Sequence, residues 1–397
     1  MKIRIREIVI LIFFSATVAS GQQVIMGTNN YVEYQVGTLP IIISVPHGGD
    51  VQPPSIPDRM CNNPVSVTDA FTIETAIEIK NRLYAITGCY PHLIISHLKR
   101  TKLDPNRNLA DGACGDSAAA IAWNEFHNFI AGARNTANQQ YSNNTFFLDL
   151  HGHGHPIQRI ELGYLLYDYE LDLSDSILNT NQYIINSSIQ NLVSSNINNY
   201  THAQLLRGPL SFGSLLENYH FPSVPSQSIP APGTTTNYFS GGYITANHTC
   251  YSPGVNINGL QMELNYLGIR DSSLNRMNFA IAFSEVIIQY MNTHFNMTWN
   301  SCAPLSTEEI ALNTLPELYP NPVQSGELLH ADYKSECKSD CIYQYTLTNS
   351  IGQNIKIGHL SKFENTIVTK GLHSGIYLIQ ISEQTSGVII VKKIVVE

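Results

Sequence analysis

Three histidines separated only by glycines follow an apolar, strand-forming run within residues 145–155. They are His151, His153 and His155, and the predicted strand ends at the first of them. In α/β proteins, ligands bind at the carboxyl ends of buried strands. Imidazole is the commonest metal ligand at neutral pH, and glycine lets the backbone approach a bound group closely. The cluster therefore predicts a metal site, where the alternative is a polar loop whose histidines face water.

Polar groups at three other strand ends complement these histidines. They lie in the segments 47–50, 100–108 and 261–264, and the ends of such strands converge on one crevice. Two histidines and a carboxylate can hold Zn²⁺ with a fourth position for water, whose pKa the metal lowers to about 7. A glutamate beside that water can take its proton, and arginines can polarise a carbonyl or bind a carboxylate. This combination predicts a zinc hydrolase.

Strands and helices alternate up to about residue 300. Apolar runs predict strands at 39–45, 93–96, 145–151, 163–166 and 259–265, and helical spacing predicts helices at 67–83, 118–137, 173–195, 212–219 and 273–293. Residues 222–258, rich in Pro, Gly, Ser, Thr and Asn, predict an irregular insertion that could wall a pocket. The alternation predicts an α/β fold whose mostly parallel or mixed sheet has helices on both faces.

The composition changes after residues 301–317, which are predicted to be a linker. Short β segments broken by turns then run to the end of the chain, which predicts a small β-sandwich over 318–397. This region resembles the C-terminal sorting domain of type IX secretion. The resemblance rests on Tyr319-Pro320-Asn321-Pro322, Gly375-Ile376-Tyr377-Leu378-Ile379 and Lys392-Lys393-Ile394-Val395-Val396. A carbohydrate-binding or adhesive β-domain is the alternative.

The first residues predict export. Lys2, Arg4 and Arg6 precede an apolar run at 8–14 and small residues up to Gly21, as in a secretory signal peptide over 1–21. No later stretch has 18 consecutive apolar residues, so no transmembrane segment is expected in the mature chain. The net charge of −9 with 13% charged residues argues against a nucleic-acid partner. We expect a secreted or cell-surface protein whose C-terminal domain engages the type IX secretion machinery.

The seven cysteines lack the paired CxxC spacing of a structural zinc site. Export permits disulfides, and Cys337 with Cys341 is the most plausible local pair. The remaining pairings cannot be predicted from the sequence.

The motifs within 39–290 together resemble a known enzyme family. Their order is similar to that in zinc carboxypeptidases and related deacylases, and looks most like that in N-formylglutamate amidohydrolases. The motifs are Ser44-Val45-Pro46-His47-Gly48-Gly49 with Pro53, then Arg100, Asp104-Pro105-Asn106-Arg107-Asn108, Asp149-Leu150-His151-Gly152 and Gln261-Met262-Glu263-Leu264. The resemblance implies a phosphorylase/hydrolase-like catalytic domain over 25–300, with Zn²⁺ as cofactor.

The resemblance also implies roles for individual residues. His47 and His151 would bind zinc, and Glu263 would act as the general base that later returns its proton to the leaving amine. Arg100 would stabilise the oxyanion. Alternatively, Glu263 could form a structural ion pair with Arg270.

Two further residues would bind the substrate's carboxylate, namely Asn106 and Arg107, unless they only cap a turn. His153 is expected to contact substrate or to support a ligand. For His155 we expect solvent exposure or a structural hydrogen bond.

The sequence offers two aspartates as candidates for the third metal ligand. Zinc carboxypeptidases place a glutamate three residues after the first histidine, where this chain has Asp50. Asp69, at the start of the next predicted helix, is the rival, and Glu74 is a more distant candidate. The sequence favours Asp50 over Asp69.

Together these features predict a secreted zinc-dependent amidohydrolase. Its substrate would be an N-acyl amino acid or peptide-like molecule with a free carboxylate, cleaved at an amide or formamide bond. The alternatives are a zinc esterase acting on polysaccharide and a non-enzymatic surface protein that binds carboxylates.

Overall fold

The computed structural model describes residues 22–142, 144–233, 236–295, 297, 317–332, 343–349, 354–361, 365–383 and 389–397. The chain divides into two compact units, residues 1–303 and 304–397. The predicted signal peptide, residues 301–316 of the predicted linker and the proposed Cys337–Cys341 pair all lie outside the described residues.

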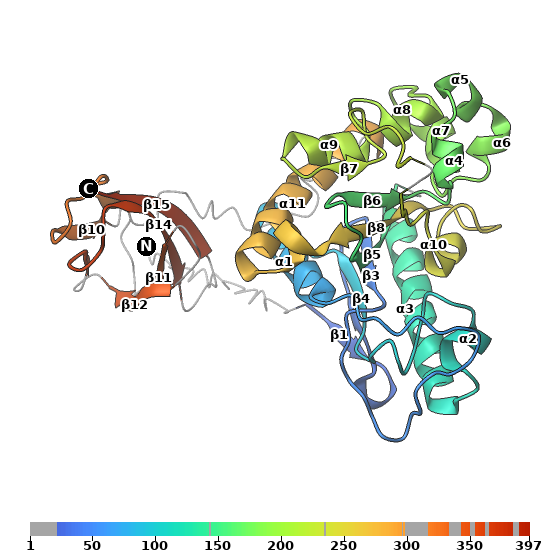
Figure 1. The fold of residues 1–397 in the computed structure, drawn as a ribbon, viewed down its shortest axis with the longest axis horizontal. Coiled ribbons are helices and arrows are strands. Elements are labelled where there is room, and N and C mark those ends of the chain that lie inside the picture. The colour runs from blue at the N-terminus through green and yellow to red at the C-terminus, as the bar shows by residue number, and fades with distance from the viewer. Residues whose placement is uncertain are drawn as a thin grey trace, which may run out of the picture. The chain divides into compact units, whose positions relative to one another are not determined.

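A mixed eight-stranded sheet forms the centre of the N-terminal unit (Figure 1). Its spatial order is β1 (Val24–Met26), β2 (Val32–Gln35), β4 (His92–Ser96), β3 (Ile41–Val45), β5 (Phe146–His153), β8 (Asn258–Asn265), β6 (Ile160–Gly163) and β7 (Ser223–Val224). The four central strands β4, β3, β5 and β8 are parallel, whereas β2 and β6 run antiparallel to their neighbours β4 and β8. The predicted α/β class with a mixed sheet is confirmed.

Helices cover both faces of this sheet because apolar residues point to both sides of its central strands. Ile41 and Ile43 of β3 belong to a core that includes residues of α1 (Thr72–Thr87) and α11 (Ser273–Phe295). Ile42, between them, belongs to a second core with α3 (Ser117–Tyr141). Figure 1 shows α3 on one side of the sheet and α1 with α11 on the other.

The order β4-β3-β5 creates a switch point in the sheet. The chain leaves β3 through α1 to form β4 on one side, and then returns through α3 to form β5 on the other side. Ligands bind at such points, outside the carboxyl ends of the strands. His47 follows β3 directly, and His151 lies near the end of β5. The topology therefore places two of the predicted site residues at the switch point.

The side of β5 that faces α3 changes from apolar to polar along the strand. Alternate residues of a strand share one face, and Phe147 on this face packs into the core with α3. Asp149, His151 and His153 then follow at the same alternation, all buried. The opposite face stays apolar through Leu150. The polar patch is thus confined to one face of one end of the sheet.

One predicted helix is wrong. Residues 173–195 contain three short helices in place of one long one, α5 (Asp175–Leu178), α6 (Asn181–Ile184) and α7 (Gln190–Ser195). Ser174 and Thr180 are extended caps that start new helices, because Ser, Thr and Asn side chains compete for backbone hydrogen bonds and favour helix ends. The predicted strand 163–166 is also misplaced, because β6 spans Ile160–Gly163 and shares only Gly163 with it.

The remaining helices are short and lie mostly around the insertion. They are α2 (Leu109–Ala113), α4 (Asp168–Leu171), α8 (His202–Arg207), α9 (Phe212–Asn218) and α10 (Tyr243–His248). The predicted irregular segment 222–258 contains only β7 and α10 as regular elements among its described residues.

A disulfide joins Cys61 to Cys114, a pair that no local sequence signal indicated. It connects the loop that follows β3 to the end of α2. Beside it, the buried Arg59 donates from Nε to the carbonyl of Arg100 (2.9 Å) and from Nη1 to that of Asp111 (3.2 Å). Two loops far apart in sequence are thereby held together next to the strand ends.

The C-terminal unit consists of two antiparallel sheets. One has the order β13-β10-β9 and the other β12-β11-β14-β15. Their bounds are β9 (Glu317–Tyr319), β10 (Leu328–Asp332), β11 (Tyr343–Asn349), β12 (Asn354–Leu360), β13 (Thr366–Val368), β14 (Gly375–Glu383) and β15 (Ile389–Val396). Residues of both sheets, including Leu329, Leu347 and Ile379, share one buried core.

We expect the N-terminal unit to fold without the C-terminal one, because each has its own buried core. A chain ending at residue 316 should keep the thermal unfolding temperature of the N-terminal unit and the circular dichroism of a folded α/β domain, yet should remain inside the producing cell. Fractionation of cells expressing the full and shortened chains measures the second effect. An unfolded shortened chain would contradict the division.

Candidate metal centre

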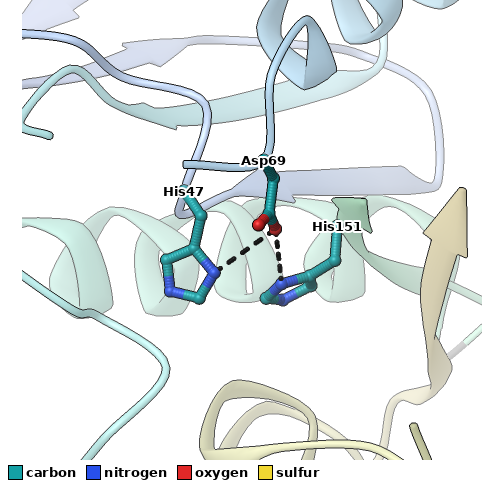
Figure 2. Close-up of side chains that lie close together, drawn as sticks. All are labelled: His47, Asp69 and His151. Carbon is teal, nitrogen blue, oxygen red and sulfur yellow. Dashed lines mark ion pairs between the residues drawn. The ribbon is translucent and has the colours of Figure 1, made fainter. Parts of the chain in front are cut away.

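Three buried side chains from separate segments meet at the switch point. His47 follows β3, Asp69 precedes α1, and His151 lies in β5. Figure 2 shows the Asp69 carboxylate facing both rings, with Oδ2 at 3.5 Å from His47 Nδ1 and 3.3 Å from His151 Nδ1. One donor atom from each residue lies within 4.8 Å of the other two. This is the donor set of a metal site with two imidazoles and one carboxylate.

The second nitrogen of each imidazole is held by a buried aspartate. His47 Nε2 lies 2.7 Å from Asp104 Oδ1, and His151 Nε2 lies 3.0 Å from Asp149 Oδ2. A carboxylate only accepts hydrogen bonds, so each Nε2 carries a proton. In the neutral ring this leaves the Nδ1 lone pair directed at the shared site. Metal-binding histidines typically have this support from a carboxylate.

An unpartnered atom also fits a cation at this place. His47 Nδ1 is buried and makes no hydrogen bond, which ordinarily costs about 1–3 kcal/mol. Asp69 Oδ2 accepts a hydrogen bond from the backbone N–H of Gly152 (3.1 Å), and Asp69 N donates to the carbonyl of His47 (3.0 Å). These contacts fix the carboxylate between the rings without using the Nδ1 atoms.

Charge within the cluster is strongly perturbed. Burial raises the pKa of Asp69, but the nearby His151 and His47 rings outweigh it and hold that pKa well below its usual value. Burial lowers the pKa of His151, but Asp149 and Asp69 outweigh it and hold that pKa well above its usual value. Both directions favour an ionised Asp69 beside a protonated His151. A metal would displace that proton, so its binding would strengthen as the pH rises.

The geometry reverses the preference for Asp50. Asp50 is exposed and is not part of the cluster that the described residues form. The reason is the path of the chain after His47: Val51 donates to the carbonyl of His97 (2.9 Å) and accepts from Lys99 (3.0 Å). This pairing directs Asp50 away from the two histidines. Glu74, on α1, is also exposed.

Glu263 lies beside the cluster on the neighbouring strand β8. It is directly opposite His151 in the parallel pair, with Oε1 at 3.9 Å from His151 Nδ1. Oε1 accepts from Gln261 Nε2 (2.9 Å), while Oε2 is buried without a hydrogen bond. Burial raises the pKa of Glu263 to about 8, opposed by His151. A carboxyl group in this range can exchange a proton near neutral pH.

Arg270 is committed to backbone carbonyls. Its guanidinium donates to Leu264 (3.2 Å), His153 (2.9 Å) and Ala70. The ion pair with Glu263 that the sequence left open is not among the ion pairs of the described residues. Glu263 therefore keeps one carboxylate oxygen for other partners.

Three arginines surround Asp104. Arg100 Nε lies 3.2 Å from Oδ2, and Arg59 Nη2 and Arg107 Nε each lie 3.5 Å from it. Burial raises the pKa of Asp104, but His47, Arg100 and Arg59 outweigh it and hold that pKa well below its usual value. The side chains of Arg107 and Arg100 are 29% and 16% exposed. This edge of the site therefore carries accessible positive charge.

Arg100 also reaches the cluster, with Nη1 at 3.6 Å from Asp69 Oδ1. Asn106 Nδ2 lies 3.5 Å from His151 Nε2 and from Gln261 Oε1, and Asn106 Oδ1 accepts from the backbone N–H of Ile244 (2.9 Å). The structure thus brings Arg100 and Asn106 to the cluster of His47, Asp69 and His151.

The sequence did not predict the support that holds this site. The motifs predicted no role for Asp104 or Asp149, and no sequence pattern indicated Arg59. Ser44 Oγ donates to Asp149 Oδ1 (2.7 Å). The available signal was strand alternation, because Ser44 and Asp149 are polar residues in otherwise apolar strands.

His153 is placed away from the first cluster. It is buried, and its Nε2 donates to the carbonyl of Arg159 (2.8 Å). His155 is half-buried, and its Nδ1 lies 2.8 Å from Glu161 Oε1. The hydrogen bond expected of His155 is present, and His153 joins it in a separate group.

Comparison with known proteins concerns the C-terminal unit. Residues 317–397 match the family described as the secretion system C-terminal sorting domain. This unit is a type IX secretion sorting domain. The protein is therefore secreted or displayed at the cell surface, and the sorting domain implies interaction with the type IX secretion machinery. Within the described residues, no helix has the length and apolarity needed to cross a membrane.

Neither a curated protein nor a solved structure matches the chain significantly. The function of the N-terminal unit is inferred below from its own residues.

Substituting the two rival aspartates separates them as ligands. Asp69→Asn should weaken zinc binding at the cluster of His47, Asp69 and His151 by at least about 100-fold, because it removes a charged donor that lies between both imidazoles. Asp50→Asn should leave zinc binding unchanged. Calorimetric titration of both purified variants with Zn²⁺ measures the difference, and equal affinities would contradict the cluster as drawn in Figure 2.

Proposed function

We propose that the N-terminal unit is a zinc-dependent amidohydrolase. The observation that carries this proposal is the convergence of His47 Nδ1, Asp69 Oδ2 and His151 Nδ1 beside Glu263, whose Oε2 is buried without a partner. Because the sorting domain directs the chain out of the cell, the substrate would be met there. It would be an N-acyl amino acid or peptide-like molecule with a free carboxylate.

The three converging residues would hold the zinc ion. Two imidazoles with one carboxylate are a frequent ligand set of catalytic zinc sites, which keep one position open. A zinc ion in such a site lowers the pKa of water and polarises a carbonyl group. The buried Asp104 and Asp149 would keep both imidazoles oriented and increase their basicity.

Glu263 would move the proton in the reaction. Its Oε2 would accept a proton from the attacking water as the new C–O bond forms. The same proton would then pass to the amide nitrogen as the C–N bond breaks, which leaves a carboxylic acid and an amine. A pKa of about 8, raised by burial, suits a group that both accepts and donates near neutral pH.

The arginines would recognise and polarise the substrate. Arg100, next to Asp69, would donate to the carbonyl oxygen as negative charge develops there. Arg107 has the more exposed side chain and lies on the outer side of Asp104, so it would bind the substrate's carboxylate. A guanidinium can form two parallel hydrogen bonds with such a group.

Replacing Glu263 tests catalysis separately from binding. Glu263→Gln should reduce kcat by about 10²–10⁴-fold with KM nearly unchanged, because a general base acts in the transition state. Zinc content should stay the same. Glu74→Gln, an exposed glutamate on α1, is the matched control. Hydrolysis of a panel of N-formyl, N-acetyl and longer N-acyl amino acids measures the effect.

Wild-type turnover by Glu263→Gln on the best substrate would reject Glu263 as the base. Cleavage of acetyl esters on polysaccharide, with no cleavage of N-acyl amino acids, would instead indicate an esterase. Zinc and carboxylate binding without turnover on either panel would indicate a binding protein.

Replacing Arg107 tests carboxylate recognition. Arg107→Ala should raise KM roughly 10- to 100-fold for substrates with a free carboxylate, because a hydrogen bond to a charged group contributes about 1.5–3 kcal/mol. KM for the corresponding amide or methyl ester should hardly change. Arg107→Lys should recover only part of the loss, since it keeps the charge but not the planar fork. An equal loss on charged and neutral substrates would place Arg107 outside the binding site.

A further inference from the structure

A second group of buried donors lies on the other side of Glu263. His153, His155 and Glu161 offer one donor atom each, all within 4.8 Å of one another. Glu161 is on β6, which pairs with β8 so that Glu161 is directly opposite Glu263. Since Glu263 is in turn opposite His151, Glu263 lies between Glu161 and His151 across the sheet, while His153 follows His151 on β5. The strand spacing of about 4.8 Å separates the backbones of β5 and β6 by roughly 10 Å.

The outer atoms of this second group are fixed by the backbone. His153 Nε2 donates to the carbonyl of Arg159 (2.8 Å), and Glu161 Oε2 accepts from the N–H of Phe239 (2.9 Å). The ring of Phe239 stacks on His155 at 4.7 Å. As in the first cluster, His153 and Glu161 are oriented through atoms that a metal would not use.

The inner atoms are available with only small changes. Because Nε2 of His153 carries the proton, its Nδ1 has a lone pair, which accepts only the N–H of His155 at 3.1 Å. His155 Nδ1 and Glu161 Oε1 are 2.8 Å apart and share a proton. A metal ion between them would displace that proton, as metal binding ordinarily does.

Charge supplies an independent reason for a cation. Glu161 and Glu263 are 1% and 4% exposed and directly opposite each other, an arrangement that is destabilising when both are ionised. In the described part of the chain, their ion pairs are with His155 and His151 only. Glu263 Oε2 has no hydrogen-bond partner. A divalent cation bound by Glu161 would offset the negative charge that this pair carries when both glutamates are ionised.

We propose that His153, His155 and Glu161 form a second metal site, which takes Zn²⁺ or another transition-metal dication. Two imidazoles favour such ions over Ca²⁺ and Mg²⁺, which prefer oxygen ligands. The site is separate from the cluster of His47, Asp69 and His151, and its existence does not depend on the proposed hydrolase activity.

Metal content of the full-length protein tests the second site. Wild type and variants are equilibrated with Zn²⁺, freed of excess metal by gel filtration and analysed for zinc per chain. Wild type should hold close to two ions, His155→Ala and Asp69→Asn close to one each, and the double variant close to none. His220→Asn changes an exposed histidine outside both groups and should match wild type. Circular dichroism verifies that each variant is folded.

His155→Gln provides a second test in case His155→Ala does not fold. The amide can still donate a hydrogen bond to Glu161 but is a poor zinc ligand, so this variant should also lose one ion. If wild type holds one ion and both His155 variants retain it, the second site is rejected. If the one ion is lost with His155 variants but kept by Asp69→Asn, the second site stands and the first is rejected.

Discussion

The site depends on the burial of three aspartates against two imidazoles. Asp69 lies between the rings, while Asp104 and Asp149 hold their outer nitrogens. Taking several charges out of water is costly, and removing one partner of a buried ion pair typically costs about 3–5 kcal/mol. The surrounding structure offsets this cost with donors: a serine hydroxyl, a backbone N–H and a ring of guanidinium groups. These donors come from β3, β5, the loop of Arg59 and the segment 100–108, so the whole carboxyl edge of the sheet must assemble correctly.

The loop that carries Asp104 shows how rigidly this edge is held. Helix α3 makes two hydrogen bonds to this loop. Trp123 Nε1 donates to the carbonyl of Arg107 (2.9 Å), and His127 Nε2 donates to that of Pro105 (3.0 Å). His127 Nδ1 in turn lies 2.7 Å from His248 Nε2, on α10. Burial lowers the pKa of His127 to about 4, so this ring stays neutral and keeps its donor directed at the loop. The loop of Asp104, α3 and α10 are therefore linked by hydrogen bonds.

The local sequence pattern predicted the secondary structure that local residues determine. Apolar runs identified the strands that end near His47 and His151, and parallel topology explained why these ends meet. The choice between Asp50 and Asp69 could not be made in this way. It depends on Val51 pairing with the segment that follows β4, a tertiary contact without a local signal. The long predicted helix at 173–195 failed for the opposite reason, because its capping residues outweighed its helical spacing.

The disulfide between Cys61 and Cys114 makes part of the structure around the site dependent on the cellular compartment. Disulfides form in oxidising compartments and are rare in the reducing cytosol. The bond joins the loop of Arg59 to the end of α2, which closes the arginine ring around Asp104. Before oxidation, no covalent bond links the loop of Arg59 to α2. After oxidation, the disulfide between Cys61 and Cys114 holds the two together. The covalent link between the loop of Arg59 and α2 therefore forms only after the chain has left the reducing cytosol.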